Sequence, residues 1–406
     1  MLLVRNLTQI ATPLGRGPVR GAAMRNLTVY ENAVIVVDGD RIAYVGAEAD
    51  NPHQIDEDFD GRGATAIPGF VDSHTHIPFA GFRESEFNRR LQGETYAEIA
   101  ASGDGIASTV RHTRAASEEE LAANVFARAA TMAHHGTTTA EAKSGYGLNL
   151  EDELKQLRAI RRAAGRSPVR LVPTCLAAHE LPPENRSASY VEEVIERILP
   201  AVADEKLATF CDAFVEQNVF TRDQGEAVLR AGAKLGMMPR LHADELSDTD
   251  GASLAAELGA ASADHLMYVS DRGIEALASS DTVANLLPAT SFFLMSERYA
   301  PARELIERGA IVSLSTDCNP GSSMTESMQT VIQLATLRMK MTVEEALTAA
   351  TLNGAYSLRM ADEIGSIEAG KRADFVLVEA PNYLHLVYHF GVNLVTAVFR
   401  DGQRVV

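Results

Sequence analysis

The segment IPGFVDSHTHIPFAGFRESEF, residues 67–87, contains two histidines one residue apart at the end of a hydrophobic run. The run is typical of a buried strand, and the histidines stand where that strand gives way to a loop. Side chains two residues apart on a strand share one face, so His74 and His76 are expected to point the same way. The chain has only 11 histidines, and the placing of two of them here indicates a shared chemical role.

Length and composition are typical of a globular protein that works inside the cell. The chain has 406 residues, 46% of them hydrophobic and 23% charged, which suffices for a large barrel and a smaller second domain. The net charge of -18 argues against nucleic-acid and anionic-membrane partners, because phosphate groups would be repelled. Cys175, Cys211 and Cys318 are an odd number of widely spaced cysteines, which favours the cytoplasm. The N-terminus has no signal-peptide pattern, and no hydrophobic run reaches the roughly 20 residues of a membrane helix.

Both ends of the chain have the pattern of β-strands. AVIVVDGDRIAYVGA (33–47) contains two strand-like runs around a turn at Gly39, and LVTAVFRDGQRVV (394–406) has a second turn of this kind. Two short β segments cannot each bury a core, so they are expected to pair. We predict one small β-sandwich domain built from residues 1–65 and 366–406.

The middle of the chain alternates short hydrophobic strands with helical segments such as 117–135, which opens with the capping-box spacing of Ser117 and Glu120. Eight strands are predicted, at 69–76, 137–145, 170–179, 211–217, 238–244, 262–266, 282–288 and 311–317. Eight successive β-then-α units predict an α/β fold in which residues 66–365 form a (β/α)₈ TIM barrel. An open doubly wound sheet is the alternative, but no glycine-rich fingerprint follows the first strand.

Histidines gather at the carboxyl ends of these strands, where a barrel of this kind carries its active site. The five are His74, His76, His179, His242 and His265, and the eighth strand ends at Asp317. Three imidazoles and one carboxylate could hold a single zinc or iron ion and leave a position for water. Buried histidines whose hydrogen bonds are satisfied are the structural alternative.

Two further side chains are placed to move protons. Glu245 follows the fifth strand in HADEL, and His265 ends the sixth, so both are candidates for activating a water molecule. The alternatives are a first-turn helix glutamate and a buried structural imidazole. A second metal would call for a bridging lysine on strand four, which instead ends with Glu216, while Lys143 belongs to strand two. We therefore expect one metal ion.

The turn sequence Asn319-Pro320-Gly321 follows the eighth strand, and Ser322 or Ser323 could cap a helix after it. Free N–H groups at such a helix start would suit an anionic oxygen, although an ordinary turn with a cap is the alternative. Arg83, Tyr96 and Tyr146 lie in loops above the strands. A loop arginine can bind a carboxylate, but it is more often a solvated surface residue.

The motifs PGFVDSHTH, HADE, ADHL and STD together resemble those of the amidohydrolase superfamily of metal-dependent hydrolases. The finer resemblance is to the members that open the ring of 4-imidazolone-5-propanoate during histidine breakdown. It is carried by the long stretches 74–100, 136–148, 242–266 and 315–324, with HFGVN near the end.

The resemblance implies a role for each matching residue. The metal ligands would be His74, His76, His242 and Asp317. The substrate contacts would be Arg83, Tyr96, Tyr146, His179, Glu245, Asn319, Gly321 and Ser322. The resemblance also implies a homodimer, a small anionic substrate and one divalent metal, Zn²⁺ or Fe²⁺/Fe³⁺. GDGI at 103–106 departs from the triple glycine usual in the family, so Asp104 could alter this loop or add negative charge near the substrate.

The expected reaction is hydrolytic ring opening to N-formimidoyl-L-glutamate. Water activated at the metal and oriented by Glu245 and His265 would add to the ring carbonyl, with His179 stabilising the oxyanion. Glu245 would then protonate the departing ring nitrogen. A deaminase acting on a heterocyclic base is the alternative enzyme, which would release ammonia and would need no carboxylate-binding set. A catalytically inactive binding protein would have lost a ligand or the acid/base, yet every one of these positions is filled.

Overall fold

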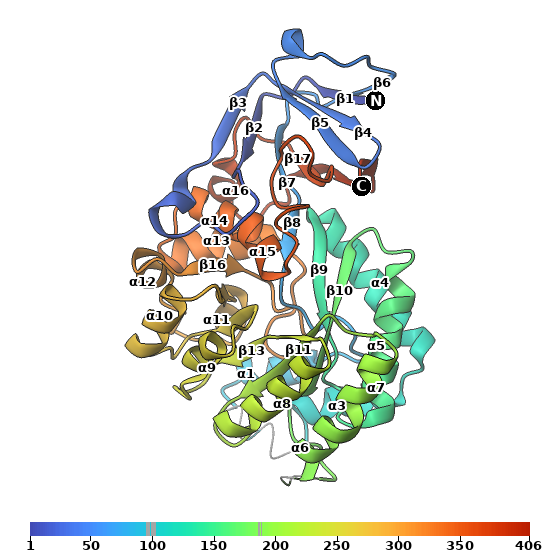
Figure 1. Cartoon of the computed structure of the whole chain (residues 1–406), viewed down its shortest axis with the longest axis vertical. Coiled ribbons are helices and arrows are strands. Elements are labelled where there is room, and N and C mark those ends of the chain that lie inside the picture. Colours follow the sequence, from blue (N-terminus) through green and yellow to red (C-terminus); the bar gives the residue numbers. More distant parts are fainter. Residues whose placement is uncertain (95–97, 99–102, 186, 188) are drawn as a thin grey trace.

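A parallel eight-stranded barrel forms the centre of the molecule in the computed structural model, which describes residues 1–94, 98, 103–185, 187 and 189–406 (Figure 1). The hydrogen-bonded order is β8-β9-β10-β11-β13-β14-β15-β16, and the short β12 (Met238–Pro239) pairs with β11. The barrel strands are β8 (Phe70–Asp72), β9 (Thr137–Lys143), β10 (Arg170–Ala178), β11 (Phe210–Val215), β13 (Leu241–Ala243), β14 (Ser262–His265), β15 (Val283–Leu286) and β16 (Ile311–Leu314). All eight predicted strands are present, and the predicted fold class is confirmed.

The barrel closes through residues that follow its first and last strands. Thr75 and Cys318 form a parallel bridge. The Asp317 N–H donates to the His74 carbonyl (3.1 Å), and the His76 N–H donates to the Cys318 carbonyl (3.0 Å). Closure of the barrel therefore brings the first and eighth strands' candidate ligands together.

Helices surround the barrel, and their capping residues explain where several begin. Ser117 and Glu120 form the predicted capping box at the start of α4 (Glu118–His134), and Asn149 caps α5 (Leu150–Ala164). In the part of the chain that the structure describes, the other helices after β8 are α1 (Glu84–Leu91), α3 (Ile106–Ala115), α6 (Ser189–Glu193), the π-helix η3 (Val194–Ile198), α7 (Leu199–Asp204), α8 (Arg222–Lys234), α9 (Gly251–Glu257), α10 (Asp271–Ala278), α11 (Pro288–Phe293), α12 (Ala302–Glu307), α13 (Met328–Met339), α14 (Val343–Ala350), α15 (Leu352–Ser357) and α16 (His385–Tyr388).

The two chain ends together build a smaller β region at one end of the molecule (Figure 1). One sheet has the order β5-β4-β1-β6 and the other β19-β18-β17-β7-β2-β3. Their strands are β1 (Leu2–Arg5), β2 (Gln9–Thr12), β3 (Thr28–Glu31), β4 (Val34–Asp38), β5 (Arg41–Gly46), β6 (Glu57–Asp60), β7 (Thr65–Pro68), β17 (Phe375–Val378), β18 (Val395–Arg400) and β19 (Gln403–Arg404), with short helices η1 (Gly21–Arg25) and η2 (Glu48–Asp50). Val4 and Ile35 of the first sheet share a buried core with Phe375 and Phe399 of the second, which is sandwich packing. The predicted domain boundaries stay a prediction.

One local expectation was wrong. The sequence suggested a helix capped by Ser322 or Ser323, but α13 begins at Met328 and is capped by Ser327, whose side chain accepts from the Thr330 N–H. The intervening turn is held by its own side chains, as described below. Among the described residues, no helix is long and apolar enough to cross a membrane.

Candidate active site

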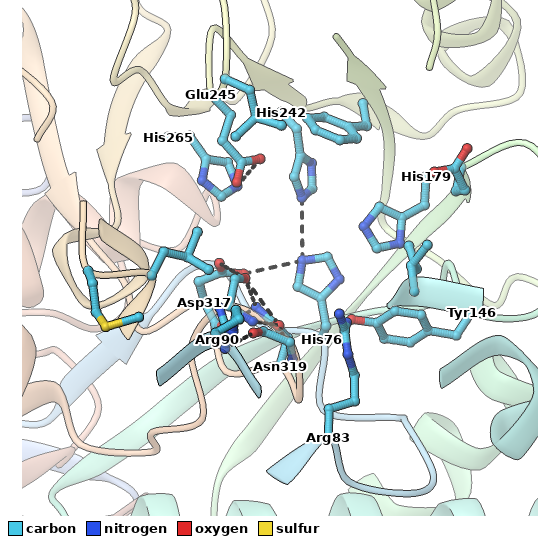
Figure 2. A pocket seen from close by; sticks show the side chains of 18 of the residues that line it. His76, Arg83, Arg90, Tyr146, His179, His242, Glu245, His265, Asp317 and Asn319 are labelled. Carbon is cyan, nitrogen blue, oxygen red and sulfur yellow. Dashed lines mark hydrogen bonds and ion pairs between the residues drawn. The ribbon is translucent and has the colours of Figure 1, made fainter. Parts of the chain in front are cut away.

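The imidazoles of His74, His76 and His242 and the carboxylate of Asp317 meet at the carboxyl end of the barrel. Figure 2 shows His76, His242 and Asp317. His76 Nε2 lies 3.2 Å from His74 Nε2, 3.4 Å from His242 Nε2 and 3.4 Å from Asp317 Oδ1. His265 also belongs to this cluster, because one of its ring nitrogens lies within 4.8 Å of ligand atoms on His74 and Asp317. The structure thus brings together the four predicted metal ligands, which come from both ends of the barrel sheet and its middle.

The chemistry of this cluster fits a metal cation. All four side chains are at most 3% exposed, so a charge on any of them is poorly solvated. Burial, with Lys143 and the neighbouring histidines adding, lowers the pKa of His74 well below its usual value, and burial with His179 does so for His76. Burial raises the pKa of Asp317 to about 6. Neutral imidazoles with converging nitrogens are what a metal ion requires, and protonated ones would repel each other.

Carboxylates behind the histidines fix the direction of their rings. Asp264 Oδ2 lies 2.7 Å from His74 Nδ1, and Asp212 Oδ2 lies 3.1 Å from His242 Nδ1. A carboxylate at Nδ1 keeps the proton on that nitrogen and leaves the Nε2 lone pair free for a metal. Sequence analysis missed both aspartates. Asp264 directly precedes His265, but nothing in the sequence shows that its side chain contacts His74, which follows a different strand.

A buried ionic cluster lies beneath this site. Lys143 Nζ lies 2.7 Å from both Glu141 Oε1 and Asp212 Oδ2, and Arg240 Nη2 lies 3.5 Å from Asp264 Oδ2. All five side chains are fully buried, so the cations offset the charge of the two carboxylates that hold the histidines. Lys143 lies on the second barrel strand, as predicted, and is engaged in these ion pairs.

The candidate acid/base lies above the histidines. Glu245 Oε2 is 3.5 Å from His265 Nε2, and Figure 2 shows both side chains on the same side of the cavity as His242. Burial raises the pKa of Glu245 well above its usual value, and the negative charges of Asp317 and Glu216 add to this effect. Burial also lowers the pKa of His265 well below normal. A carboxylate whose pKa is raised is a stronger base than an ordinary one, so Glu245 is suited to accept a proton and then return it.

A cavity of about 500 Å³ opens over these groups, a size that suits a small organic ligand. His179 lines it, and its Nδ1–H donates to the Gly145 carbonyl, 2.9 Å away, which leaves Nε2 toward the cavity. Its ring stacks on His76 at 5.0 Å, and Tyr146 lies beside both rings. Burial with His242 lowers the pKa of His179 to about 3, so this imidazole is neutral.

The turn after β16 does not offer the free N–H groups expected from the sequence. Asn319 Oδ1 accepts from the N–H groups of Gly321 and Ser322, both at 2.8 Å. Asn319 Nδ2 in turn donates to the Ser322 hydroxyl oxygen (2.8 Å). The asparagine side chain closes the turn on itself, so an anionic ligand would have to displace it to reach these donors.

Two arginines line the cavity beside this turn, Arg83 directly before α1 and Arg90 within it. Arg83 is held by Glu86, with Nε 2.8 Å from Oε2 and Nη2 2.5 Å from Oε1. Arg90 Nη2 donates to the Gly321 carbonyl (3.0 Å), and its guanidinium lies 5.5 Å from the Phe87 ring and 5.4 Å from the Phe293 ring. Sequence analysis missed Arg90. The available signal was its spacing of seven residues from Arg83, which is two helical turns.

Most predicted contact residues therefore share one cavity. Its lining includes Arg83, Tyr146, His179, Glu245, Asn319, Gly321 and Ser322, together with His76, His242, His265 and Asp317. His74 is fully buried against His76. Tyr96 falls outside the described residues. Asp104 Oδ2 lies 2.6 Å from Arg89 Nη1, so its charge is paired.

Comparisons with known proteins agree with this geometry. Residues 65–405 match the model of the amidohydrolase family. Imidazolonepropionase of Bacillus velezensis is 45% identical, over 100% of this chain and 96% of its own length. Imidazolonepropionase of Caldanaerobacter subterraneus subsp. tengcongensis is 46% identical, over 100% and 98%. Among solved structures, a triazine hydrolase variant is 17% identical with a TM-score of 0.77, covering 100% of this chain and 94% of its own. An adenosine deaminase from Xanthomonas campestris with bound zinc is 21% identical with a TM-score of 0.71, covering 99% and 92%. At these identities the solved structures show the fold alone.

Proposed function

The chain belongs to the amidohydrolase family and, within it, to the imidazolonepropionases, and from this premise we propose how its residues carry out the reaction. The enzyme is a hydrolase that opens the cyclic amide of 4-imidazolone-5-propanoate to give N-formimidoyl-L-glutamate in histidine degradation. The observation that carries the proposal is the meeting of four ligand-type side chains, a buried Glu245 and two arginines around one small cavity.

A divalent metal fits the cluster of His74, His76, His242 and Asp317. Three imidazole nitrogens and one carboxylate oxygen suit both zinc and ferrous iron, and we propose one such ion as the cofactor. When bound, the ion would lower the pKa of a coordinated water to roughly 7 and polarise a carbonyl oxygen. Asp264 and Asp212 would orient His74 and His242 toward it.

The arginines bind the propanoate carboxylate in our proposal. Asn319 already takes the N–H groups of the turn, which leaves the cationic side chains as the better partners. A guanidinium offers paired donors matched to a carboxylate. Glu86 fixes Arg83, and the two aromatic rings fix Arg90, so little side-chain entropy remains to be lost on binding. This places the propanoate tail beside α1 and the ring toward the histidines.

Glu245 and His265 carry the proton transfers. Glu245 takes the proton of the water whose oxygen bonds to the ring carbonyl carbon. The bond between that carbon and the ring nitrogen then breaks, and Glu245 returns the proton to the departing nitrogen. Neutral His179 carries its one ring proton on Nδ1, which donates to the Gly145 carbonyl, so its Nε2 can only accept a hydrogen bond, for example from the substrate ring. The developing oxyanion would be stabilised by a bound metal, rather than by the His179 expected from the sequence. The sum is addition of one water molecule to the substrate.

Deamination of a heterocyclic base is the weaker alternative. It is supported only by solved structures with low sequence identity, such as the adenosine deaminase at 21%, and these share only the fold. A neutral base also offers no carboxylate to the guanidinium groups of Arg83 and Arg90 that line the cavity.

The test is turnover of 4-imidazolone-5-propanoate by the purified protein, followed as loss of ring absorbance, with product identification and metal analysis. We expect formation of N-formimidoyl-L-glutamate without ammonia, together with loss of turnover after chelation or in Glu245→Gln. Ammonia release from an amino-heterocycle, with no turnover of the imidazolone, would favour the deaminase. Metal analysis of the active preparation would distinguish zinc from iron. The homodimer and the cytoplasmic location stay predictions.

A further inference from the structure

In the loop after β13, the neighbouring acidic side chains of Asp244 and Glu245 point in opposite directions. Asp244 turns away from the cavity, and its carboxylate accepts from the N–H groups of Thr249, Gly251 and Ala252, each at 3.0 Å. It thereby holds the start of α9. The next residue, Glu245, faces the cavity. The backbone on the other side of Glu245 needs its own anchor if that side chain is to stay in place.

Glu216 supplies that anchor from the neighbouring strand. It directly follows β11, whose Phe214 and Val215 are register partners of His242 and Ala243 in β13. Its Oε2 accepts from the N–H groups of Leu246 (2.8 Å) and Ser247 (3.2 Å), and its Oε1 accepts from the Ser247 hydroxyl. The carboxylate thus binds the two residues that come next after Glu245.

Glu216 is itself rigidly held. Its side chain is buried, with 4% exposed, and its Oε1 also accepts from the Gln217 N–H (2.8 Å). Its own N–H donates to the Phe220 carbonyl (3.1 Å). An ionised acceptor that binds several N–H groups makes stronger hydrogen bonds than a neutral one. A buried, fixed carboxylate is therefore a firm support for the Glu245 loop.

We propose that Glu216 is a positioning residue for catalysis, which holds Glu245 at the height above the histidine cluster where it can reach both the water and the departing nitrogen. The inference rests on the proposed role of Glu245. Glu216 acts through Glu245 and the loop, so its loss should slow the chemical step and leave substrate binding intact. A displacement of about 1 Å at a reacting group can cost roughly 100-fold in rate.

The test is Glu216→Gln, which keeps the side-chain volume and one acceptor oxygen. We expect kcat to fall about 10- to 100-fold while KM stays within about twofold. Ser247→Ala, which removes only the hydroxyl, should give a smaller loss of kcat. Glu345→Gln is the matched control. Glu345 in α14 is also a buried carboxylate that accepts from a backbone N–H, that of Thr342 (2.8 Å), and it pairs with Arg303 of α12. The control should lower Tm by a similar amount and keep wild-type kcat.

A double-mutant cycle separates positioning from general destabilisation. The cycle uses the residual turnover of Glu245→Gln, measured at high enzyme concentration; in this background Glu216→Gln should cause no further loss, because the group that it positions is already gone. Full additivity of the two losses would overturn the proposal. Unchanged kcat in Glu216→Gln, or an equal loss in Glu345→Gln, would also overturn it. Wild-type turnover in the same assay keeps the result separate from the proposed function, since failure of that function would abolish activity in every variant, including the wild type.

Discussion

The guanidinium of Arg83 occupies the space that a side chain at Gly321 would need. A Cβ built on Gly321 would lie 2.2 Å from Arg83 Nη1, well inside the contact distance of two heavy atoms. Glu86 holds the other side of the same guanidinium at 2.5–2.8 Å, so the arginine cannot retreat freely. Arg83 can therefore keep this position only if residue 321 has no side chain.

Gly321→Ala should push Arg83 out of its place. We expect KM for the imidazolone substrate to rise about 10-fold or more with a smaller change in kcat, because a binding contact is lost while Glu245 and the histidines stay in place. Steady-state kinetics measures both constants. Gly17→Ala is the control, since a Cβ at Gly17 would meet nothing within 4 Å. An unchanged KM would mean that Arg83 does not bind the substrate in its present position.

Arg90 should share the carboxylate with Arg83. Arg90→Met keeps the hydrophobic stem but removes the charge, and we expect KM to rise about 10- to 100-fold, the range typical of a lost charged hydrogen bond. Arg90→Lys should recover part of the loss. Arg404→Met, which removes a guanidinium stacked 5.3 Å from Phe59 in the β region, should leave KM alone. Equal KM values in all three variants would show that Arg90 does not bind the substrate.

The fold and most of the site follow from sequence patterns that are local. All eight barrel strands could be predicted because each is a short hydrophobic run between helical segments, and closure then places strand-end residues such as His76 and His242 in one cluster. The turn at Asn319 was misjudged for a physical reason. Its side chain accepts from the N–H groups of Gly321 and Ser322 and so closes a separate turn, and the helix begins only at Met328.

Other features depend on contacts between distant segments and have no local pattern. Asp212 and Asp264 could not be assigned to His242 and His74 before the strand order and register were known. His265, with φ 82°, has a left-handed backbone conformation that only the folded surroundings can impose on a non-glycine residue.

Metal affinity should depend on Asp264. Asp264→Asn replaces the charged acceptor at His74 Nδ1 with a neutral group that can turn its NH₂ toward the ring, and we expect metal affinity to fall about 10- to 100-fold. Competition between the protein and a chromophoric chelator measures this without an activity assay. Asp362→Asn is the control, because Asp362 is an exposed residue after α15. Wild-type affinity in Asp264→Asn would show that the carboxylate does not orient the ligand.

The pH profile should report the raised pKa of Glu245. Its basic form accepts the water proton, so kcat/KM should fall as the pH drops through a pKa above that of an ordinary glutamate, which is about 4.3. Burial is the largest cause of the shift, and the charge of Asp317 comes next. The measurement is kcat/KM across the acidic range with the metal content held constant. An acidic limb at the ordinary glutamate value would assign the base to another group.

Asp104 should have little effect on the reaction, although it replaces a glycine usual in the family. Its carboxylate pairs with Arg89 at 2.6 Å, and Arg89 also pairs with Glu94 at 2.6 Å. Both partners of the first pair are partly exposed, at 43% and 29%, so the pair contributes at most about 1 kcal/mol. Gly103 and Gly105 on either side have positive φ angles of 85° and 73°. Asp104 does not have a positive φ angle, so its backbone conformation does not require glycine. Asp104→Gly is therefore expected to change KM by less than about threefold, and Asp104→Asn still less. A large fall in KM for the glycine variant would mean that the Asp104 charge reaches the anionic substrate despite Arg89.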